Sequence, residues 1–296
     1  MDTAKLKSDY DRDGYVVAEG IIPSTLLADL RAETIRMVEA AREGRLIGRH
    51  FDIIDTTTGP DLRRIADPED AAEIYDQAMR FDPLVELVTA LLGGTCRFDH
   101  GKLNFKPPSG GGALDWHQDY AFYPQTNQDM LAVGIMIEDC TEENGPLMVI
   151  PGSHRGTGGI DGGPIYDHHQ AGMFVGGVPA SALDGLDAQA VALTAPAGSI
   201  SIHHAATLHA STANRGRTNR PLLLYNYFAN DAFPVHYTYD WQAFNTRILR
   251  GAEVSQPRYD PLPCKIPQPV PKAADDSLTG SIFAVQQGLE GGAVLT

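Results

Sequence analysis

The sequence predicts a mainly β fold with flanking helices, whose core is a sandwich or a barrel. Apolar residues recur near helical spacing in the first hundred residues, whereas short runs with a period of two follow them. The 30 glycines and 20 prolines cluster in this second part, as turns between many short strands. We therefore expect one domain over residues 1–296, with a helical part at about 1–95, a β core at about 96–230 and a C-terminal extension over 231–296.

Two helical stretches are expected in the first part. One begins at Pro23-Ser24 and ends at Gly44, because leucines recur at helical spacing after the proline and glycine often follows a helix end. The other covers about residues 67–92 and is interrupted at Asp82-Pro83, since proline breaks a helix interior. A short strand over residues 15–17 is expected before the first helix, and a short helix near residues 241–249.

The second part contains eight strand candidates separated by turn residues. They are Cys96–Phe105, Leu114–Tyr120, Met130–Glu138, Gly145–Pro151, Val191–Leu193, Ser199–His203, Leu208–Thr212 and Leu222–Phe228. Glu143-Asn144-Gly145 has the composition of a hairpin turn. We expect the glycine-rich residues 157–186 to form a long loop over one mouth of the β core, a lid that helps to select the substrate.

Composition limits the possible partners. The net charge of −15 disfavours binding to nucleic acid or to anionic lipid, both of which need positive charge. No apolar run approaches the ~20 residues of a membrane span, and the N-terminus lacks a secretory apolar region. Three scattered cysteines, Cys96, Cys140 and Cys264, do not form a disulfide framework. We therefore expect a soluble cytoplasmic protein that acts on a small molecule.

The most informative motif is Trp116-His117-Gln118-Asp119-Tyr120, on a predicted strand. Residues two apart on a strand project from the same face, so His117 and Asp119 offer a nitrogen and a carboxylate oxygen to one point. One more histidine would complete the two-histidine, one-carboxylate triad of non-haem Fe(II) oxygenases, which leaves one side of the metal open. Asp115 shares this face and is an alternative carboxylate. A lone His-x-Asp pair occurs by chance, so the third ligand has to support it.

His209 is the preferred third ligand. Ser211 lies two residues further along the same strand face, and Arg220 begins the next strand. A guanidinium group binds a carboxylate through two parallel hydrogen bonds, which suits the far carboxylate of a 2-oxo diacid. The other downstream histidines are His154, His168, His169, His203, His204 and His236. We expect His203 and His204 to be hydrogen-bonded wall residues.

Taken together, the motifs resemble those of the phytanoyl-CoA dioxygenase (PhyH) family of Fe(II)/2-oxoglutarate-dependent oxygenases. The similarity spans about residues 8–230, and the motifs occur in family order. They are Asp13-Gly14-Tyr15-Val16-Val17, Lys106-Pro107-Pro108, Trp116-His117-Gln118-Asp119, Glu142-Glu143-Asn144-Gly145-Pro146-Leu147, Pro151-Gly152-Ser153-His154, and His209-Ala210-Ser211 followed by Arg220. The resemblance implies a double-stranded β-helix, that is, a cupin-like jelly-roll core with flanking helices.

The resemblance also implies roles for individual residues. By motif, His117, Asp119 and His209 would bind Fe(II), with 2-oxoglutarate and O₂ as cosubstrates. Arg220 and Ser211 would hold the far carboxylate of 2-oxoglutarate.

Further cosubstrate contacts are implied for Gln118, between two of the ligands, for Lys102, and for Arg64. Lys102 also has a simpler alternative. It shares one strand face with Lys106, and both can be exposed surface lysines.

The substrate is not implied by the family. Relatives often carry an aromatic residue where this chain has Gly134, so we expect a larger pocket if this position faces the cavity. Trp116, Tyr120 and Phe122 either stack on a substrate or pack in the barrel, and Asn226 is a further candidate contact. We expect a small natural-product or amino-acid-like substrate, since the net charge disfavours a polyanion such as an acyl-CoA.

The expected activity is that of a dioxygenase, an oxidoreductase that oxidises an unactivated C–H bond and releases succinate and CO₂. Halogenating relatives lack the carboxylate that Asp119 supplies, so its presence argues against halogenation. Hydroxylation is the first expectation, and desaturation and cyclisation are further outcomes. Two other classes stay open. One is a cupin-like metal-dependent hydrolase or isomerase, and the other is a non-catalytic binding barrel.

Overall fold

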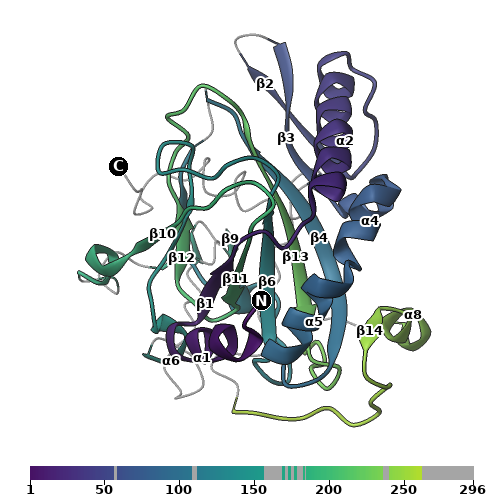
Figure 1. Cartoon of the computed structure of the whole chain (residues 1–296), viewed down its shortest axis with the longest axis vertical. Helices are drawn as coiled ribbons and strands as arrows, with labels where there is room; N and C mark the ends of the chain where they lie inside the picture. Colours follow the sequence, from purple (N-terminus) through teal and green to yellow (C-terminus); the bar gives the residue numbers. More distant parts are fainter. Residues whose placement is uncertain are drawn as a thin grey trace.

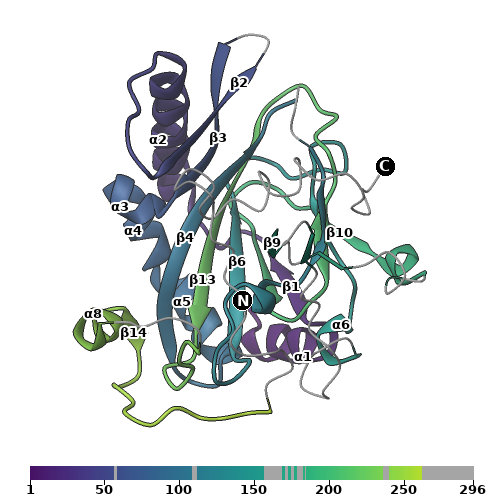
Figure 2. The same ribbon diagram turned by 180° about the vertical axis from the view of Figure 1, so that it is seen from behind.

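Two antiparallel sheets form the core, and helices cover the outer face of the larger sheet (Figures 1 and 2). The computed structural model describes residues 1–56, 59–108, 112–156, 169–170, 173–174, 177–178, 183, 185–235 and 240–261. The helices are α1 (Thr3–Asp13), α2 (Ser24–Arg42), α3 (Pro68–Ala71), α4 (Glu73–Met79), α5 (Asp82–Leu91), α6 (Ser153–Gly156) and α8 (Trp241–Thr246), with short 3₁₀ turns η1 (Asp119–Ala121) and η2 (Leu186–Gln189).

The larger sheet has the strand order β1-β11-β6-β13-β4-β3-β2, with β14 paired to β4. Its strands are β1 (Tyr15–Ala18), β2 (Phe51–Thr56), β3 (Gly59–Ala66), β4 (Cys96–Lys106), β6 (Met130–Met136), β11 (Ile200–His204), β13 (Arg220–Phe228) and β14 (Ile248–Arg250). The smaller sheet has the order β10-β7-β12-β5, from β5 (Leu114–His117), β7 (Leu147–Val149), β10 (Val191–Leu193) and β12 (His209–Ser211). A separate pair joins β8 (His169–Gln170) and β9 (Met173–Phe174).

Helix packing decides which face of the larger sheet lines the interior. On β13, Leu223, Tyr225 and Tyr227 face the helices and belong to the main hydrophobic core. The hydroxyl of Tyr225 donates to Tyr75 O, and the hydroxyl of Tyr227 donates to Met79 O at 2.8 Å. These two hydrogen bonds connect β13 to α4. Because side chains alternate along a strand, Arg220, Leu222, Leu224 and Asn226 face the smaller sheet and line the space between the two sheets.

The predicted jelly-roll core is confirmed. All eight strand candidates contain a strand, and both helical stretches form, the second as three helices with Pro83 in the first turn of α5. Two parts of the N-terminal region differ from the expectation. Helix α1 begins where the Asp2 side chain accepts a hydrogen bond from Lys5 N, and the β2–β3 hairpin lies within the part expected to be helical.

The β2–β3 hairpin escaped prediction because it is an edge element with charged side chains. Arg63 on β3 donates to Asp52 on β2, with 2.8 Å between Nε and Oδ2. Charged residues are common on edge strands, where they discourage pairing with another chain, and they hide the apolar alternation.

The predicted hairpin at Asn144-Gly145 is wrong, although the turn itself exists. Gly145 has φ +82°, which favours glycine, but β6 before the turn and β7 after it belong to different sheets. The turn therefore carries the chain from the larger sheet to the smaller one, a crossing that a local turn motif does not reveal.

Most of the predicted lid, residues 157–186, lies outside the described residues. Where it is described, Val178 N donates to Trp116 O at 2.8 Å, so this segment lies along β5. Among the described helices, none combines the length and hydropathy needed to cross a bilayer.

Candidate active site

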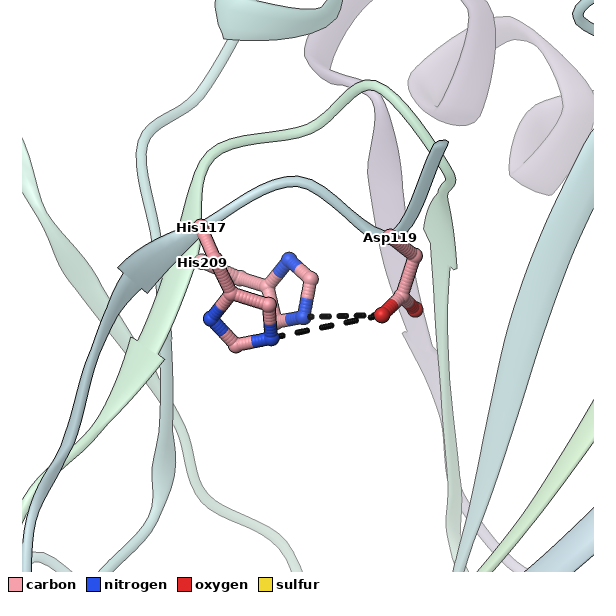
Figure 3. Close-up of side chains that lie close together, drawn as sticks. All are labelled: His117, Asp119 and His209. Atoms are coloured by element: carbon pink, nitrogen blue, oxygen red, sulfur yellow. Dashed lines mark ion pairs between the residues drawn. The ribbon is translucent and has the colours of Figure 1, made fainter. Parts of the chain in front are cut away.

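Three buried side chains converge at the end of the smaller sheet nearest to β11. His117 ends β5, His209 begins β12, and these two residues lie directly opposite each other in the β5–β12 pair. The Nε2 atoms of His117 and His209 lie 4.0 Å and 3.7 Å from Oδ1 of Asp119 (Figure 3). One donor atom from each residue lies within 4.8 Å of the other two. Two imidazoles and one carboxylate around one point are the donor set of a non-haem Fe(II) site.

Main-chain carbonyls fix the orientation of both imidazoles. His117 Nδ1 lies 2.8 Å from Asp115 O, and His209 Nδ1 lies 2.9 Å from Thr207 O. A carbonyl only accepts, so each Nδ1 carries the proton and each Nε2 presents its lone pair to the shared point. Such contacts to the non-ligating nitrogen set the tautomer and the ring orientation of metal-bound histidines.

The ionisation states also suit a cation. Burial lowers the pKa of His117 and lowers the pKa of His209 well below its usual value, so both imidazoles are neutral near pH 7. Burial acts in the opposite direction on Asp119, but His209 and then Lys102 hold the pKa of this carboxyl well below its usual value. The site therefore combines one negative charge with two neutral nitrogen donors.

Asp119 reaches this point from a turn, not from the strand that was predicted to carry it. Strand β5 ends at His117, and Asp119 begins the 3₁₀ turn η1, in which Phe122 N donates to Asp119 O at 2.9 Å. Gln118 between them keeps an extended backbone, with φ −128° and ψ 127°. The alternation therefore still places both side chains on one side, so the conclusion holds although the strand boundary was wrong.

His203 and His204 are wall residues, as predicted. His203 Nε2 lies 3.3 Å from Asp119 Oδ2, and its ring centre lies 4.4 Å from that of His209. His204 points to the other face of β11, where its Nδ1 accepts a hydrogen bond from Ala206 N. Among the candidates for a third ligand, His168 and His236 lie outside the described residues, as does the side chain of His169. His154 is buried, and its ring centre lies 5.4 Å from that of His204 in a tilted arrangement.

A second cluster, of two basic side chains, lies further along the same interior. Arg220 and Lys106 face each other across the β13–β4 pair, and their exposed fractions are only 4% and 2%. Arg220 Nη2 donates to Gly145 O, and Lys106 Nζ donates to Thr212 O. Arg220 Nε is buried and finds no hydrogen-bond partner in the described part of the chain. No described carboxylate forms an ion pair with either cation, so the cluster has the charge and the donors to hold an anion.

The alternative that Lys106 is an exposed surface lysine is thus wrong. Burial, and next the charge of Arg220, lower the pKa of Lys106 to about 6. One signal in the sequence pointed to Lys106, because it shares the period of two with Lys102 along β4 and the two side chains therefore lie on one face. Ser211 is also buried, on the same face of β12 as His209, as predicted.

Of the other implied cosubstrate contacts, Lys102 and Arg64 lie on the interior face of the larger sheet. Lys102 stands opposite Leu224, and Arg64 stands opposite Asn104. Gln118 is different, because it is fully buried and its Nε2 donates to Ala206 O at 2.8 Å. This contact fixes the Gln118 side chain beside the ligand residues, and its cosubstrate contact stays a prediction.

Two of the aromatic candidates for substrate binding turn out to be packing residues. Trp116 belongs to a hydrophobic cluster with Ile150 and Leu208, on the opposite face of β5 from His117. Tyr120 is fully buried and its hydroxyl donates to Gln125 O at 2.6 Å. Phe122 remains a candidate, because it is half-buried with its ring centre 6.0 Å from that of His117, in an edge-to-face arrangement.

Gly134 does not enlarge the cavity, contrary to the expectation. It lies on the interior face, but a Cβ there would stand 2.9 Å from Ser201 Oγ, 3.3 Å from Leu222 Cδ1 and 3.4 Å from Leu224 Cδ2. The leucine side chains occupy the space that a larger residue would fill. They join Met136 and Cys140 in an apolar cluster, so this side of the interior is narrow.

Comparison with known proteins agrees with this geometry. The family model described as phytanoyl-CoA dioxygenase (PhyH) matches residues 10–222, which include the three converging side chains and Arg220. The chain belongs to the phytanoyl-CoA dioxygenase family. It is therefore an Fe(II)- and 2-oxoglutarate-dependent dioxygenase, as the motifs predicted, and the hydrolase and binding-barrel alternatives are not supported.

Several family members are similar over most of the chain. A probable alpha-ketoglutarate-dependent hypophosphite dioxygenase of Stutzerimonas stutzeri is 32% identical, covering 97% of this chain and 98% of that protein. The L-proline trans-4-hydroxylase of Streptomyces griseoviridis is 31% identical over 78% of this chain and 88% of its own length. The crystal structure of EctD from S. alaskensis with bound Fe has a TM-score of 0.63 at 23% identity and covers 77% of this chain and 76% of that one.

Proposed function

We propose that His117, Asp119 and His209 bind Fe(II), and that Arg220 anchors the far carboxylate of 2-oxoglutarate, with Ser211 and Lys106 beside it. The convergence of two Nε2 atoms, each with its Nδ1 bound to a carbonyl, on one buried carboxylate carries this proposal. When bound, Fe(II) and 2-oxoglutarate supply the oxidising power for the reaction with O₂.

The remaining interior residues prepare the space between the two clusters. Met136, Leu222 and Leu224 form an apolar wall that excludes water and suits the methylene groups of 2-oxoglutarate. His203 holds the second oxygen of Asp119, which keeps Oδ1 directed at the two imidazoles. The chain thus contributes positioning and a dry cavity.

Hypophosphite is the first substrate candidate, because the similarity to the hypophosphite dioxygenase covers nearly the whole of both chains. The reaction would insert one oxygen atom of O₂ into a P–H bond and give phosphite. The other oxygen atom would enter succinate as CO₂ leaves. This bond differs from the C–H bond expected from the sequence, and a small C–H substrate such as L-proline is the comparison to test.

Anaerobic addition of Fe(II) and 2-oxoglutarate to the metal-free enzyme should produce the visible metal-to-ligand charge-transfer band of a chelated cosubstrate. Admission of O₂ with hypophosphite should then release succinate and phosphite in equal amounts. Zn(II) in place of Fe(II) is the control and should give neither signal. A folded protein that forms no band would contradict the proposed metal and cosubstrate site. A band without hypophosphite-dependent succinate would contradict only the substrate.

Lys106 should make cosubstrate binding depend on pH. Its pKa of about 6 leaves it mostly neutral in the free enzyme at higher pH, and a carboxylate bound beside it favours the charged form. Binding then takes up a proton, so the affinity for 2-oxoglutarate should fall as pH rises from about 6 to 9, by at most about tenfold per unit. Arg220 stays charged in this range, and burial raises the pKa of the neighbouring Cys140 thiol, which stays neutral.

The measurement is a pH series of 2-oxoglutarate titrations of the anaerobic Fe(II) enzyme. In the variant Lys106→Met this dependence should be flatter, because methionine cannot take up the proton. Equal slopes for the wild type and the variant would contradict the role of Lys106.

We also propose a cytoplasmic location. The thiols of Cys96 and Cys140 are buried and unpaired, as expected in a reducing compartment. Fractionation of cells that express the full chain tests this location.

A further inference from the structure

A row of polar side chains crosses the larger sheet at the level of the proposed iron site. His203, which contacts Asp119, stands opposite Ala132 on β6, and Ala132 stands opposite Asn226 on β13. Asn226 in turn stands opposite His100 on β4. Residues directly opposite each other in an antiparallel pair project to the same face, so Asn226 and His100 face the interior as His203 does.

Lys102 brings a positive charge to this part of the interior. It lies two residues from His100 on β4. Burial is the largest influence on both neighbouring groups, lowering the pKa of His117 and raising that of Asp119, and the charge of Lys102 lowers the pKa of each. In the described part of the chain Lys102 forms no ion pair or hydrogen bond, and its closest aromatic contact is the Tyr123 ring, 5.9 Å from Nζ. A half-buried ammonium group without a counter-ion is costly, and an anion bound beside it would offset that cost.

Asn226 adds a hydrogen-bonding group that is not fully used. It is completely buried, its Nδ2 lies 2.7 Å from His100 Nε2, and its Oδ1 has no hydrogen-bond partner among the residues that the structure describes. His100 Nδ1 in turn lies 2.8 Å from Asp99 Oδ2. Rotation of the Asn226 amide by half a turn would let Oδ1 accept from a protonated Nε2 and would present Nδ2 to the interior as a donor.

The positive charges in the interior exceed what the cosubstrate needs. The two carboxylates of 2-oxoglutarate are matched by the iron and by the Arg220–Lys106 cluster, which lies four residues further along β4 than Lys102. Lys102 is therefore available for a second anion. Leu224 stands next to Lys102 in the β13–β4 pair, and it fills the space beside Gly134 together with Leu222, so the room beside Lys102 suits a small anion.

We propose that Lys102, with Asn226 and His100, forms an anion subsite beside the Asp119 edge of the metal site, and that the substrate is a small oxyanion. This inference rests on the proposed function. It assigns Lys102 to the substrate, whereas the family resemblance implies a cosubstrate contact. It also explains how a chain of net charge −15 accepts an anionic substrate, because local positive charge outweighs the distant negative charge.

The decisive comparison is between the wild type and Lys102→Met, which keeps the length of the side chain and removes its charge. The anaerobic enzyme with Fe(II) and 2-oxoglutarate is titrated with hypophosphite, phosphite and formate, and the shift of the charge-transfer band reports binding. Lys102→Met should weaken oxyanion binding by about tenfold or more and change the 2-oxoglutarate dissociation constant by less than about twofold. Lys5→Met, on the exposed surface of α1, is the matched control and should change neither value.

A second measurement uses the metal-free enzyme and needs no turnover. Phosphite should raise the Tm of the wild type more than that of Lys102→Met, and Lys102→Arg should recover part of the difference. Equal losses of oxyanion and 2-oxoglutarate affinity in Lys102→Met would assign Lys102 to the cosubstrate and overturn the proposal. Band shifts with neutral small molecules but with no oxyanion would also overturn it. Absence of the band in the wild type would instead overturn the proposed function.

Discussion

His209→Ala should weaken Fe(II) binding by at least about a hundredfold and bring 2-oxoglutarate turnover below detection. The structure gives His209 a single partner for its Nδ1, the carbonyl of Thr207, so its Nε2 is free to ligate. Removal of this imidazole leaves one nitrogen and one carboxylate, which is too few donors for a facial site. The measurements are Fe(II) titration under anaerobic conditions and succinate formation in air.

The control has to separate loss of iron from loss of fold. His209 is buried between His117 and His203, with ring centres 4.0 Å and 4.4 Å away, so its removal leaves a small cavity. We expect a lower Tm but an unchanged circular dichroism spectrum. His50→Ala, which removes a histidine bound to Ala66 O outside the metal site, should keep full iron binding. An unchanged iron stoichiometry in His209→Ala would contradict the proposed ligand set.

The sequence was sufficient to bring together the side chains of the proposed metal site, because the two decisive relations are short in range. The alternation along β5 places His117 and Asp119 on one side, and the alternation along β12 does the same for His209 and Ser211. The pairing of the two strands, with His209 opposite His117, depends on the tertiary structure. The order of the family motifs supplied it, and the residues alone did not.

The environment of β4 was not predictable in the same way. Its alternation puts His100, Lys102, Asn104 and Lys106 on one face, but a period of two does not say whether that face meets solvent or the interior. The answer depends on the helices, which cover the opposite face through Tyr225 and the rest of the main core. For the same reason the effect of Gly134 was misjudged, since the space beside it is filled by leucines from a neighbouring strand.

Arg220→Met should raise the 2-oxoglutarate concentration needed for half-maximal turnover by about 10- to 100-fold, since hydrogen bonds to charged groups contribute about 1.5–3 kcal/mol. Iron binding should be nearly unchanged, because Arg220 lies at the far end of β13 from the row that contains His203. Arg217→Met, on the exposed turn before β13, is the matched control and should leave the cosubstrate requirement unchanged.

Lys106 decides how complete this loss is. Burial lowers the pKa of Lys106 most, and the charge of Arg220 lowers it further. Arg220→Met should therefore raise this pKa and return Lys106 toward its charged form. The remaining ammonium group would then hold the carboxylate in part. The loss of cosubstrate affinity in the double variant Arg220→Met/Lys106→Met should therefore exceed the sum of the losses in the two single variants. Strictly additive losses would show that the two cations act independently, and a normal 2-oxoglutarate requirement in the double variant would remove this cluster from the cosubstrate site.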